Sequence, residues 1–207
     1  LAPIEGDNPS GEPTQYSGLY DEIREARRYD DTSVSYGEWQ TDLKVADYRK
    51  VIELATSALS SQTKDLQISV WLTEALTGQQ GFAGLRDGVQ LIRRLEENFW
   101  DTLYPEIDEG DMEARANAID WMNREVSLMI KRIPITAGEG FNFNNFEESV
   151  RFDFPEDIDA LVYEEQGKFR AIKEQAEKEN RKTGEQWRKA TKATSRAFAE
   201  VLKLTLD

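Results

Sequence analysis

Apolar residues at helical spacing constrain the fold of this chain more than any other feature. In the longest run, from Phe82 to Leu103, successive apolar side chains are 3, 4, 3, 3, 4 and 4 residues apart. This spacing places them on one face of a helix, whereas a half-buried strand would alternate apolar and polar residues. The run therefore predicts a long amphipathic helix that uses Phe82, Leu85, Val89, Ile92, Leu95, Phe99 and Leu103.

Four further stretches before residue 135 have the same period. The third has apolar residues on more than one side, which predicts a helix buried between two neighbours. The predicted helices run from an N-cap at Ser17 to Arg28, from Asp47 to Leu59, from Thr63 or Lys64 to Leu76, and from a cap at Asp111 to Ile130, with Pro134 as the stop.

The remainder of the chain adds helices and almost no strand. Helical spacing returns after Pro155 and again from Trp187 onward. Residues 141–154 alternate aromatic and polar side chains, but no second strand is available to pair with them, which favours an extended aromatic-rich loop packed on helices. With six to eight helices, we expect an all-α fold, either a multi-helix antiparallel bundle or stacked helix pairs.

The domain organisation follows from turn residues and charge. Residues 1–16 contain three prolines and two glycines, which predicts an extended lead-in. Residues 17–162 form the predicted helical domain, and residues 163–207 form more basic helices that could pack on the same domain or contact a partner. Residues 1–162 hold 15 basic and 32 acidic side chains, against 11 and 8 in residues 163–207. Because the first residue is Leu1, we expect a fragment of a longer chain.

Several classes of chemistry lose their usual residues. The chain has no cysteine and no histidine, so it lacks thiolate ligands, disulfides and the commonest general base. A net charge of −14 would repel nucleic acid and anionic membranes, and no stretch is apolar enough to insert into a bilayer. An oxygen-ligated metal could be sought only in acidic loops such as residues 5–8 and 108–111, which fit a calcium loop poorly, so we expect no metal or cofactor.

The tryptophans divide into two groups. Trp71, Trp100 and Trp121 lie within helical patterns and are expected in the core. Trp39, in a predicted loop, and Trp187, near the start of a basic helix, are less constrained and are the candidate partner-binding residues. The alternative for Trp39 is that it closes the end of the helical bundle.

Nine short motifs stand in an order that resembles the N-terminal domain of the TssA/ImpA family of the bacterial type VI secretion system, over about residues 3 to 136. They are Pro3-Ile4, residues 7–12, residues 20–28, Gly37-Glu38-Trp39, Lys64-Asp65-Leu66, residues 71–76, residues 81–85, residues 99–105 and Arg132-Ile133-Pro134.

The resemblance implies a non-enzymatic assembly factor in the bacterial cytoplasm. Its partners would be baseplate, tail tube or sheath subunits and the membrane complex. Oligomerisation would use a C-terminal region that this chain lacks. The resemblance leaves open whether the whole protein starts or terminates sheath growth.

The motif residues are expected to be structural, because their spacing is that of a helical interior and the glycines let helices approach. Lys64 and Asp65 are expected to cap or brace the third helix. The set comprises Gly37, Glu38, Lys64, Asp65, Trp71, Leu72, Ala75, Leu76, Gly81, Phe82, Gly84, Leu85, Trp100 and Pro134.

Two alternatives from other classes have distinct signatures. A carboxylate-based or metal-assisted enzyme would need a pocket in which two acids have raised pKa values. A generic helical adaptor would show degenerate helix pairs stacked along one axis. No spacing among the acidic residues singles out a catalytic pair, so the assembly and docking function is favoured.

Overall fold

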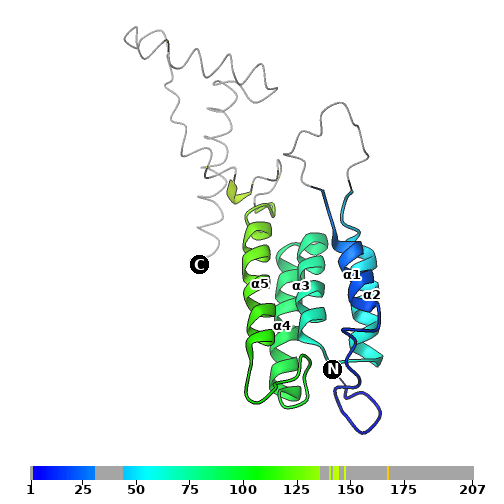
Figure 1. Cartoon of the computed structure of the whole chain (residues 1–207). Helices are drawn as coiled ribbons and strands as arrows, with labels where there is room; N and C mark the ends of the chain where they lie inside the picture. Colours follow the sequence, from blue (N-terminus) through cyan, green and yellow to red (C-terminus); the bar gives the residue numbers. More distant parts are fainter. Residues whose placement is uncertain are drawn as a thin grey trace. The chain divides into compact units, whose positions relative to one another are not determined.

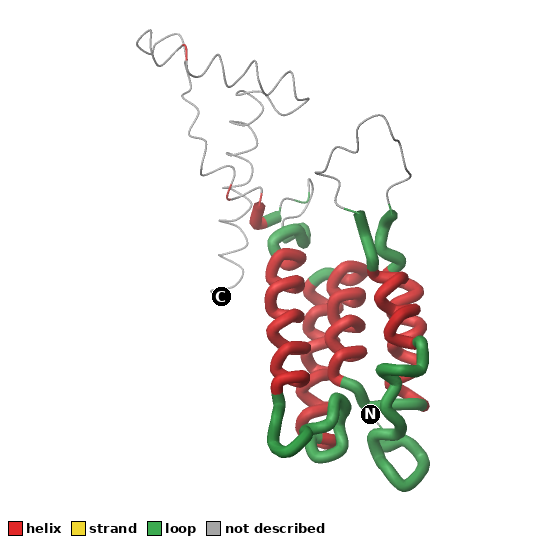
Figure 2. The backbone as a smooth tube through the Cα atoms, in the orientation of Figure 1, coloured by secondary structure: helices red, strands yellow, loops and turns green. Residues whose placement is uncertain are grey.

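The structure is a computed structural model that describes residues 2–30, 44–135, 140, 142–144, 147 and 167. Within these ranges the chain forms five α-helices and no strand (Figure 1, Figure 2). The predicted all-α class is thus confirmed. Two compact units are present, residues 1–130 and residues 131–207. The helices are α1 (Leu19–Arg27), α2 (Tyr48–Ser61), α3 (Leu66–Gln80), α4 (Phe82–Phe99) and α5 (Glu113–Ile130).

Aspartate side chains fix the start of two helices. Asp47 is the N-cap of α2, and its side chain accepts a hydrogen bond from the Lys50 N–H at 3.1 Å. Asp65 caps α3 in the same way by accepting from the Ile68 N–H, also at 3.1 Å. Such caps satisfy one of the free N–H groups of a first turn and typically contribute about 1 kcal/mol.

The predictions were wrong for the start of α1 and for both ends of α3, and α4 ends at Phe99, before the predicted Leu103. The N-cap of α1 is Gly18, with φ of 85°, because the Ser17 hydroxyl turns back to donate to the Thr14 carbonyl instead of capping the helix. Helix α3 starts at Leu66, two residues later than the latest predicted start, because Lys64 is held in an extended connection by backbone hydrogen bonds to Ser10 and Tyr104. The same helix continues past Leu76 to Gln80.

Helix α3 is the centre of the first unit. It packs on α2, α4 and α5, and α1 packs mainly on α2. Ten of its fifteen residues are buried, which confirms the wide buried face predicted for it. Each large apolar side chain buried in this way contributes roughly 1.5–3 kcal/mol relative to exposure. The core formed around α3 includes Ile23, Val51, Leu66, Val70, Trp71, Leu72, Ala75, Leu95 and Leu103.

Glycines allow α4 to lie directly against α3. A Cβ atom on Gly84 would overlap the backbone carbonyl of Leu76, and one on Gly88 would lie 2.5 Å from the Thr73 hydroxyl. The close approach expected from these glycines is therefore present. Gly81 forms the whole connection between the two helices, with φ of 61°, which a residue with a side chain rarely adopts.

Two residues that were expected in the interior lie at the ends of α4 and are exposed instead. Phe82, in its first turn, is 46% exposed, and Trp100, its C-cap, is 41% exposed. Both were predicted to be core. The helical period identifies most of the buried face of α4, but Phe82 and Trp100 stand at its ends, where they are only partly covered, and Val89 in its middle is 45% exposed, also against expectation. Leu76 and Leu85 are half-buried, whereas Trp71, Leu72 and Ala75 are buried as expected and Trp121 packs partly buried against the core.

In the second unit the structure describes few residues. Phe143, Asn144 and Glu147 are helical, so the predicted extended loop is wrong at these positions. Lys131 pairs with Glu147 at 3.6 Å and its ammonium lies 5.4 Å from the centre of the Phe143 ring. Of the helices predicted after Pro155 the structure describes only Gly167, which is helical, and the boundary between residues 162 and 163 lies outside the described residues.

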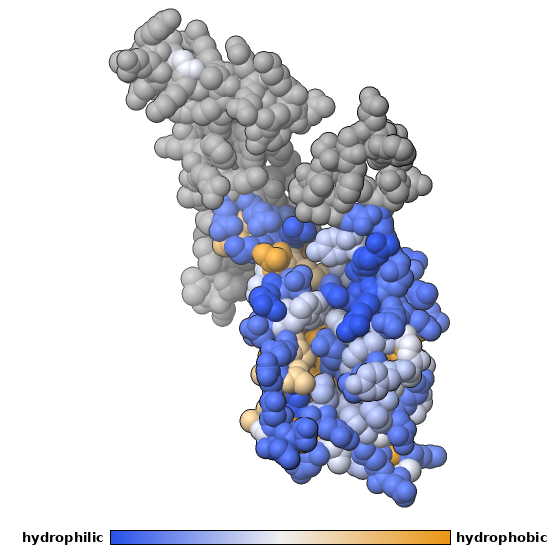
Figure 3. Space-filling model, in the orientation of Figure 1, coloured by the Kyte–Doolittle hydropathy of each residue, from blue (hydrophilic) through white to orange (hydrophobic). Residues whose placement is uncertain are grey.

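Most of the first unit's surface is polar. On the face shown in Figure 3, hydrophilic residues predominate and hydrophobic ones form only small groups. Among the described residues, no helix is both long enough and apolar enough to cross a membrane.

Candidate functional site

Lys64, the first residue of the Lys64-Asp65 motif, is buried between the N-terminal segment and α4. Only 1% of its surface is exposed, and its ammonium donates to the Leu59 carbonyl at 2.6 Å. The Phe99 ring lies 5.7 Å from the same nitrogen. Burial lowers the pKa of this amine. The side chain therefore joins the end of α2 to α4 and is not available to a partner.

Asp65 lies in an equally closed environment. Its carboxylate accepts a hydrogen bond from the Tyr20 hydroxyl at 2.7 Å in addition to the helix-capping bond. Burial raises the pKa of Asp65 to about 6, and the hydrogen bonds from Tyr20 and Ile68 only partly oppose this effect. The expectation that Asp65 caps α3 is confirmed, and the structure adds that it ties α1 to α3.

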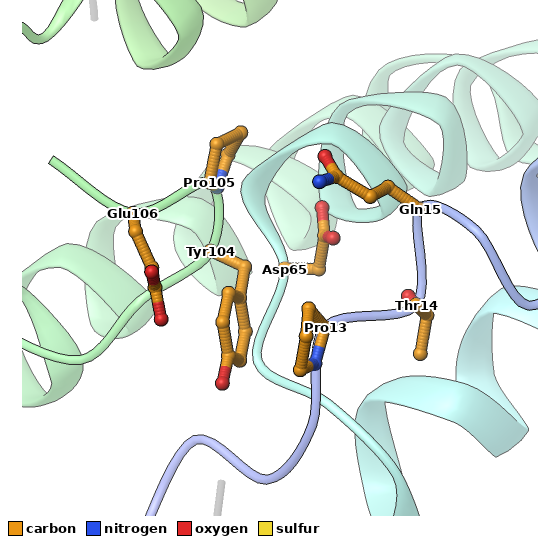
Figure 4. A pocket seen from close by; sticks show the side chains of 7 residues that line it. All are labelled: Pro13, Thr14, Gln15, Asp65, Tyr104, Pro105 and Glu106. Carbon is orange, nitrogen blue, oxygen red and sulfur yellow. The ribbon is translucent and has the colours of Figure 1, made fainter. Parts of the chain in front are cut away.

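A small pocket lies beside Asp65 and is lined from three parts of the chain. Figure 4 shows the segment from Pro13 to Gln15 on one side, the segment from Tyr104 to Glu106 on the other, and Asp65 between them. Its volume is about 290 Å³. The hydroxyl of Thr14 is buried and has no hydrogen-bond partner among the described residues, which makes this a polar hollow suited to water.

The N-terminal segment is attached to this region by long-range hydrogen bonds. Asn8 donates to the Tyr104 hydroxyl at 3.0 Å, and that hydroxyl donates to the Gly11 carbonyl at 3.0 Å. The hydroxyls of Ser10 and Thr102 lie 2.7 Å apart. The predicted lead-in is therefore an integral part of the first unit.

A second buried acid, Glu74, also has a raised pKa because of burial, opposed by Arg27. Arg27 donates to its carboxylate at 2.7 Å and lies 4.4 Å from the centre of the Trp121 ring. Asp65 and Glu74 are nine positions apart along α3, which separates them by roughly 14 Å along the helix axis. The structure therefore does not bring these two acids together as a carboxylate enzyme would need.

An open, more apolar hollow lies between α4 and α5. Its volume is about 410 Å³, and exposed Trp100 and Met112 stand at its edge. Arg115 fixes the connection between these helices by donating to the carbonyls of Trp100 at 2.8 Å, Pro105 at 2.8 Å and Leu103. The hollow is lined by Leu66, Glu96, Trp100, Met112, Arg115, Ala116, Ile119, Asp120 and Asn123.

The candidate partner-binding residues taken from the sequence, Trp39 and Trp187, lie outside the described residues, as do Gly37 and Glu38. Trp100 was missed as an exposed aromatic residue because it continues an apolar helical run. Residues 95–114 around it contain eight acidic side chains and no basic one.

These observations define a helical structural domain, in which the buried charges join helices and two exposed apolar side chains, Trp100 and Met112, lie beside one open hollow. Residues 1–124 match the family described as ImpA, N-terminal, type VI secretion system. The chain belongs to this family, as the ordered motifs predicted.

Two relatives agree with this assignment. The chain is 27% identical over 145 residues to the type VI secretion system component TssA1 of Pseudomonas aeruginosa. That match covers 68% of this chain and 42% of the relative, so the chain spans less than half of the relative's length. A solved structure matches this chain with a TM-score of 0.68 and 27% sequence identity. The match covers 96% of this chain and 78% of the solved chain. It is the N-terminal domain, including the ImpA_N region, of the TssA component of the type VI secretion system from Burkholderia cenocepacia.

Proposed function

We propose that this domain is a non-enzymatic docking module that helps to coordinate baseplate, tail tube and sheath assembly in a type VI secretion system. The observation that carries the proposal is the family match over residues 1–124, together with a relative that is itself a type VI secretion component. The partners would be subunits of that machine on its cytoplasmic side.

The charge of the domain supports protein partners with basic surfaces. The net charge of −14 disfavours nucleic acid and anionic membranes as partners. Electrostatic contacts of exposed groups weaken as salt rises, because the Debye length is about 8 Å at physiological ionic strength and shorter above it. If the whole protein forms a ring through a further region, several copies would strengthen binding through avidity.

The test is an affinity capture with the folded domain as bait, from a lysate that contains all components of the secretion system. The capture is repeated at low and high salt, and an unrelated acidic helical domain of similar size serves as the control bait. We expect baseplate, tube or sheath subunits to be enriched over the control. Failure to enrich any of them, with the bait shown to be folded by circular dichroism, would contradict the proposal.

A further inference from the structure

The hollow between α4 and α5 has the form of a groove. Both helices pack on α3, whereas they make at most marginal contact with each other. Leu66, at the start of α3, contributes to the lining of the hollow between them. The hollow between α4 and α5 is open on one side and has a volume of about 410 Å³.

The walls of this groove present apolar groups at helical intervals. Met112, just before α5, and Ala116 and Ile119 on α5 line the hollow at intervals of four and three positions, and the next lining position on this face, Asn123, is polar. The apolar part of this face, from residue 112 to residue 119, is roughly 10 Å long, about two helical turns. Met112 is 50% exposed and Trp100 is 41% exposed, which places two large apolar side chains within reach of a partner.

The charge around the groove is strongly acidic. Residues 95–114 carry eight acidic side chains and no basic one, and Glu96 and Asp120 line the groove itself. Arg115 is the only basic residue in the lining, and its guanidinium already donates to three backbone carbonyls. Apart from the exposed amide of Asn123, the other lining groups are apolar or negatively charged, and one of the carboxylates, Asp120, pairs with Arg124 at 3.6 Å on the surface of α5.

We propose that the α4–α5 groove binds an amphipathic helix of a partner protein, with a large apolar side chain beside Trp100 and lysine or arginine facing the acidic rim. In helix-in-groove recognition the bound helix places apolar anchors, three or four residues apart, in a hydrophobic groove, and Trp100, Met112 and Ile119 supply apolar lining for such anchors here. The inference rests on the proposed docking function, since it names the surface and the chemistry of the partner segment.

A synthetic peptide with the chemistry of the inferred partner segment tests the groove directly. The probe is a labelled peptide of roughly 18 residues, about five helical turns, with leucine on one face and lysine on the other. One comparison peptide has the same composition in scrambled order, and another has glutamate in place of lysine. We expect the amphipathic lysine peptide alone to bind the domain, with fluorescence anisotropy as the readout.

Matched variants then locate the binding. Trp100→Ala should weaken peptide binding at least tenfold, the size of effect expected for an anchor residue. Phe82→Ala removes an equally exposed aromatic residue at the other end of α4 and should leave binding within about twofold. If Trp100→Ala lowers the melting temperature, Met112→Lys replaces it as the test, since Met112 is half-exposed and the new charge repels lysine.

Charge reversal tests the acidic rim. The double variant Glu96→Lys, Asp120→Lys should weaken binding and reduce its salt dependence, whereas Glu53→Lys, an exposed change on α2, should not. Equal binding by the scrambled peptide, or no effect of Trp100→Ala and Met112→Lys, would overturn the inference.

The same variants, used as bait in the lysate, separate this inference from the proposed function. If secretion subunits are captured equally by wild type and Trp100→Ala, docking stands and the groove is wrong. If the peptide binds in a Trp100-dependent manner and no secretion subunit is captured, the groove stands and the proposed partners are wrong. Loss of captured subunits on Trp100→Ala, with Phe82→Ala unaffected, supports both.

Discussion

Neutralising Asp65 should change how the stability of the domain depends on pH. Burial raises the pKa of this carboxyl to about 6 from an ordinary value of 3.8, so the folded state holds a proton that the unfolded state releases between these values. The folded state then binds more protons, and stability falls as pH rises through this window. A difference of about two pKa units corresponds to about 3 kcal/mol when fully expressed.

The perturbation is Asp65→Asn, which keeps one oxygen to accept from the Ile68 N–H, turns an amide NH2 donor toward the Tyr20 oxygen in place of the second acceptor, and does not ionise. Wild type should lose stability relative to this variant by about 2–3 kcal/mol between about pH 4 and pH 7, with most of the change below pH 6. Well below pH 3.8, the Asp65 carboxyl is protonated in both the folded and the unfolded state. The difference in stability between wild type and Asp65→Asn then reflects only the exchange of hydrogen bonds.

The assay is urea unfolding followed by circular dichroism at a series of pH values, from which the free energy of unfolding is extrapolated for each protein. Glu53→Gln, which neutralises an exposed carboxylate on α2, is the control and should not reproduce the effect. A difference between wild type and Asp65→Asn that is constant across this range, or that changes with the opposite sign, would refute the reasoning.

Three further changes have defined outcomes. Gly84→Ala should destabilise the domain by more than about 1 kcal/mol, measured by urea unfolding, because the new Cβ overlaps the Leu76 carbonyl; a neutral result would contradict the close packing of α3 and α4. Arg27→Ala should cost about 3 kcal/mol or more by leaving the Glu74 carboxylate buried without its partner, and adding Glu74→Gln should recover part of the loss in a double-mutant cycle. Arg115→Lys should lower the melting temperature, because an ammonium cannot reproduce the planar fork that donates to three carbonyls; an unchanged temperature would show that these bonds contribute little.

The sequence predicted the helices well and their ends less well. Apolar spacing identified the faces of α2, α4 and α5, and the buried side chains of α3 confirmed its wide apolar surface. The same spacing placed Phe82 and Trp100 in the core, because a period identifies a face and not how far along that face the neighbouring helices extend. The exposure of Trp100 depends on how α3, α4 and α5 meet, which no local pattern encodes.

Buried polar groups were harder to anticipate than apolar ones. Asp65 has the residue type of a helix cap and was expected to cap or brace α3, but its bond to Tyr20 joins segments 45 positions apart. Lysine is typically a surface residue, yet Lys64 is almost fully buried because the Leu59 carbonyl accepts a hydrogen bond from its ammonium. Contacts of this kind depend on the tertiary arrangement and cannot be inferred from neighbouring residues alone.

The attachment of the N-terminal segment has a consequence for the order in which the domain is made. Asn8 and Ser10 reach their partners Tyr104 and Thr102 across 96 and 92 positions of the chain. At synthesis rates of about 5–20 residues per second, roughly 5 to 20 s pass between translation of the two sides of each contact. The part of the domain that leaves the ribosome first is thus among the last to be fixed in place, and chaperones that bind nascent chains have access to it throughout that interval.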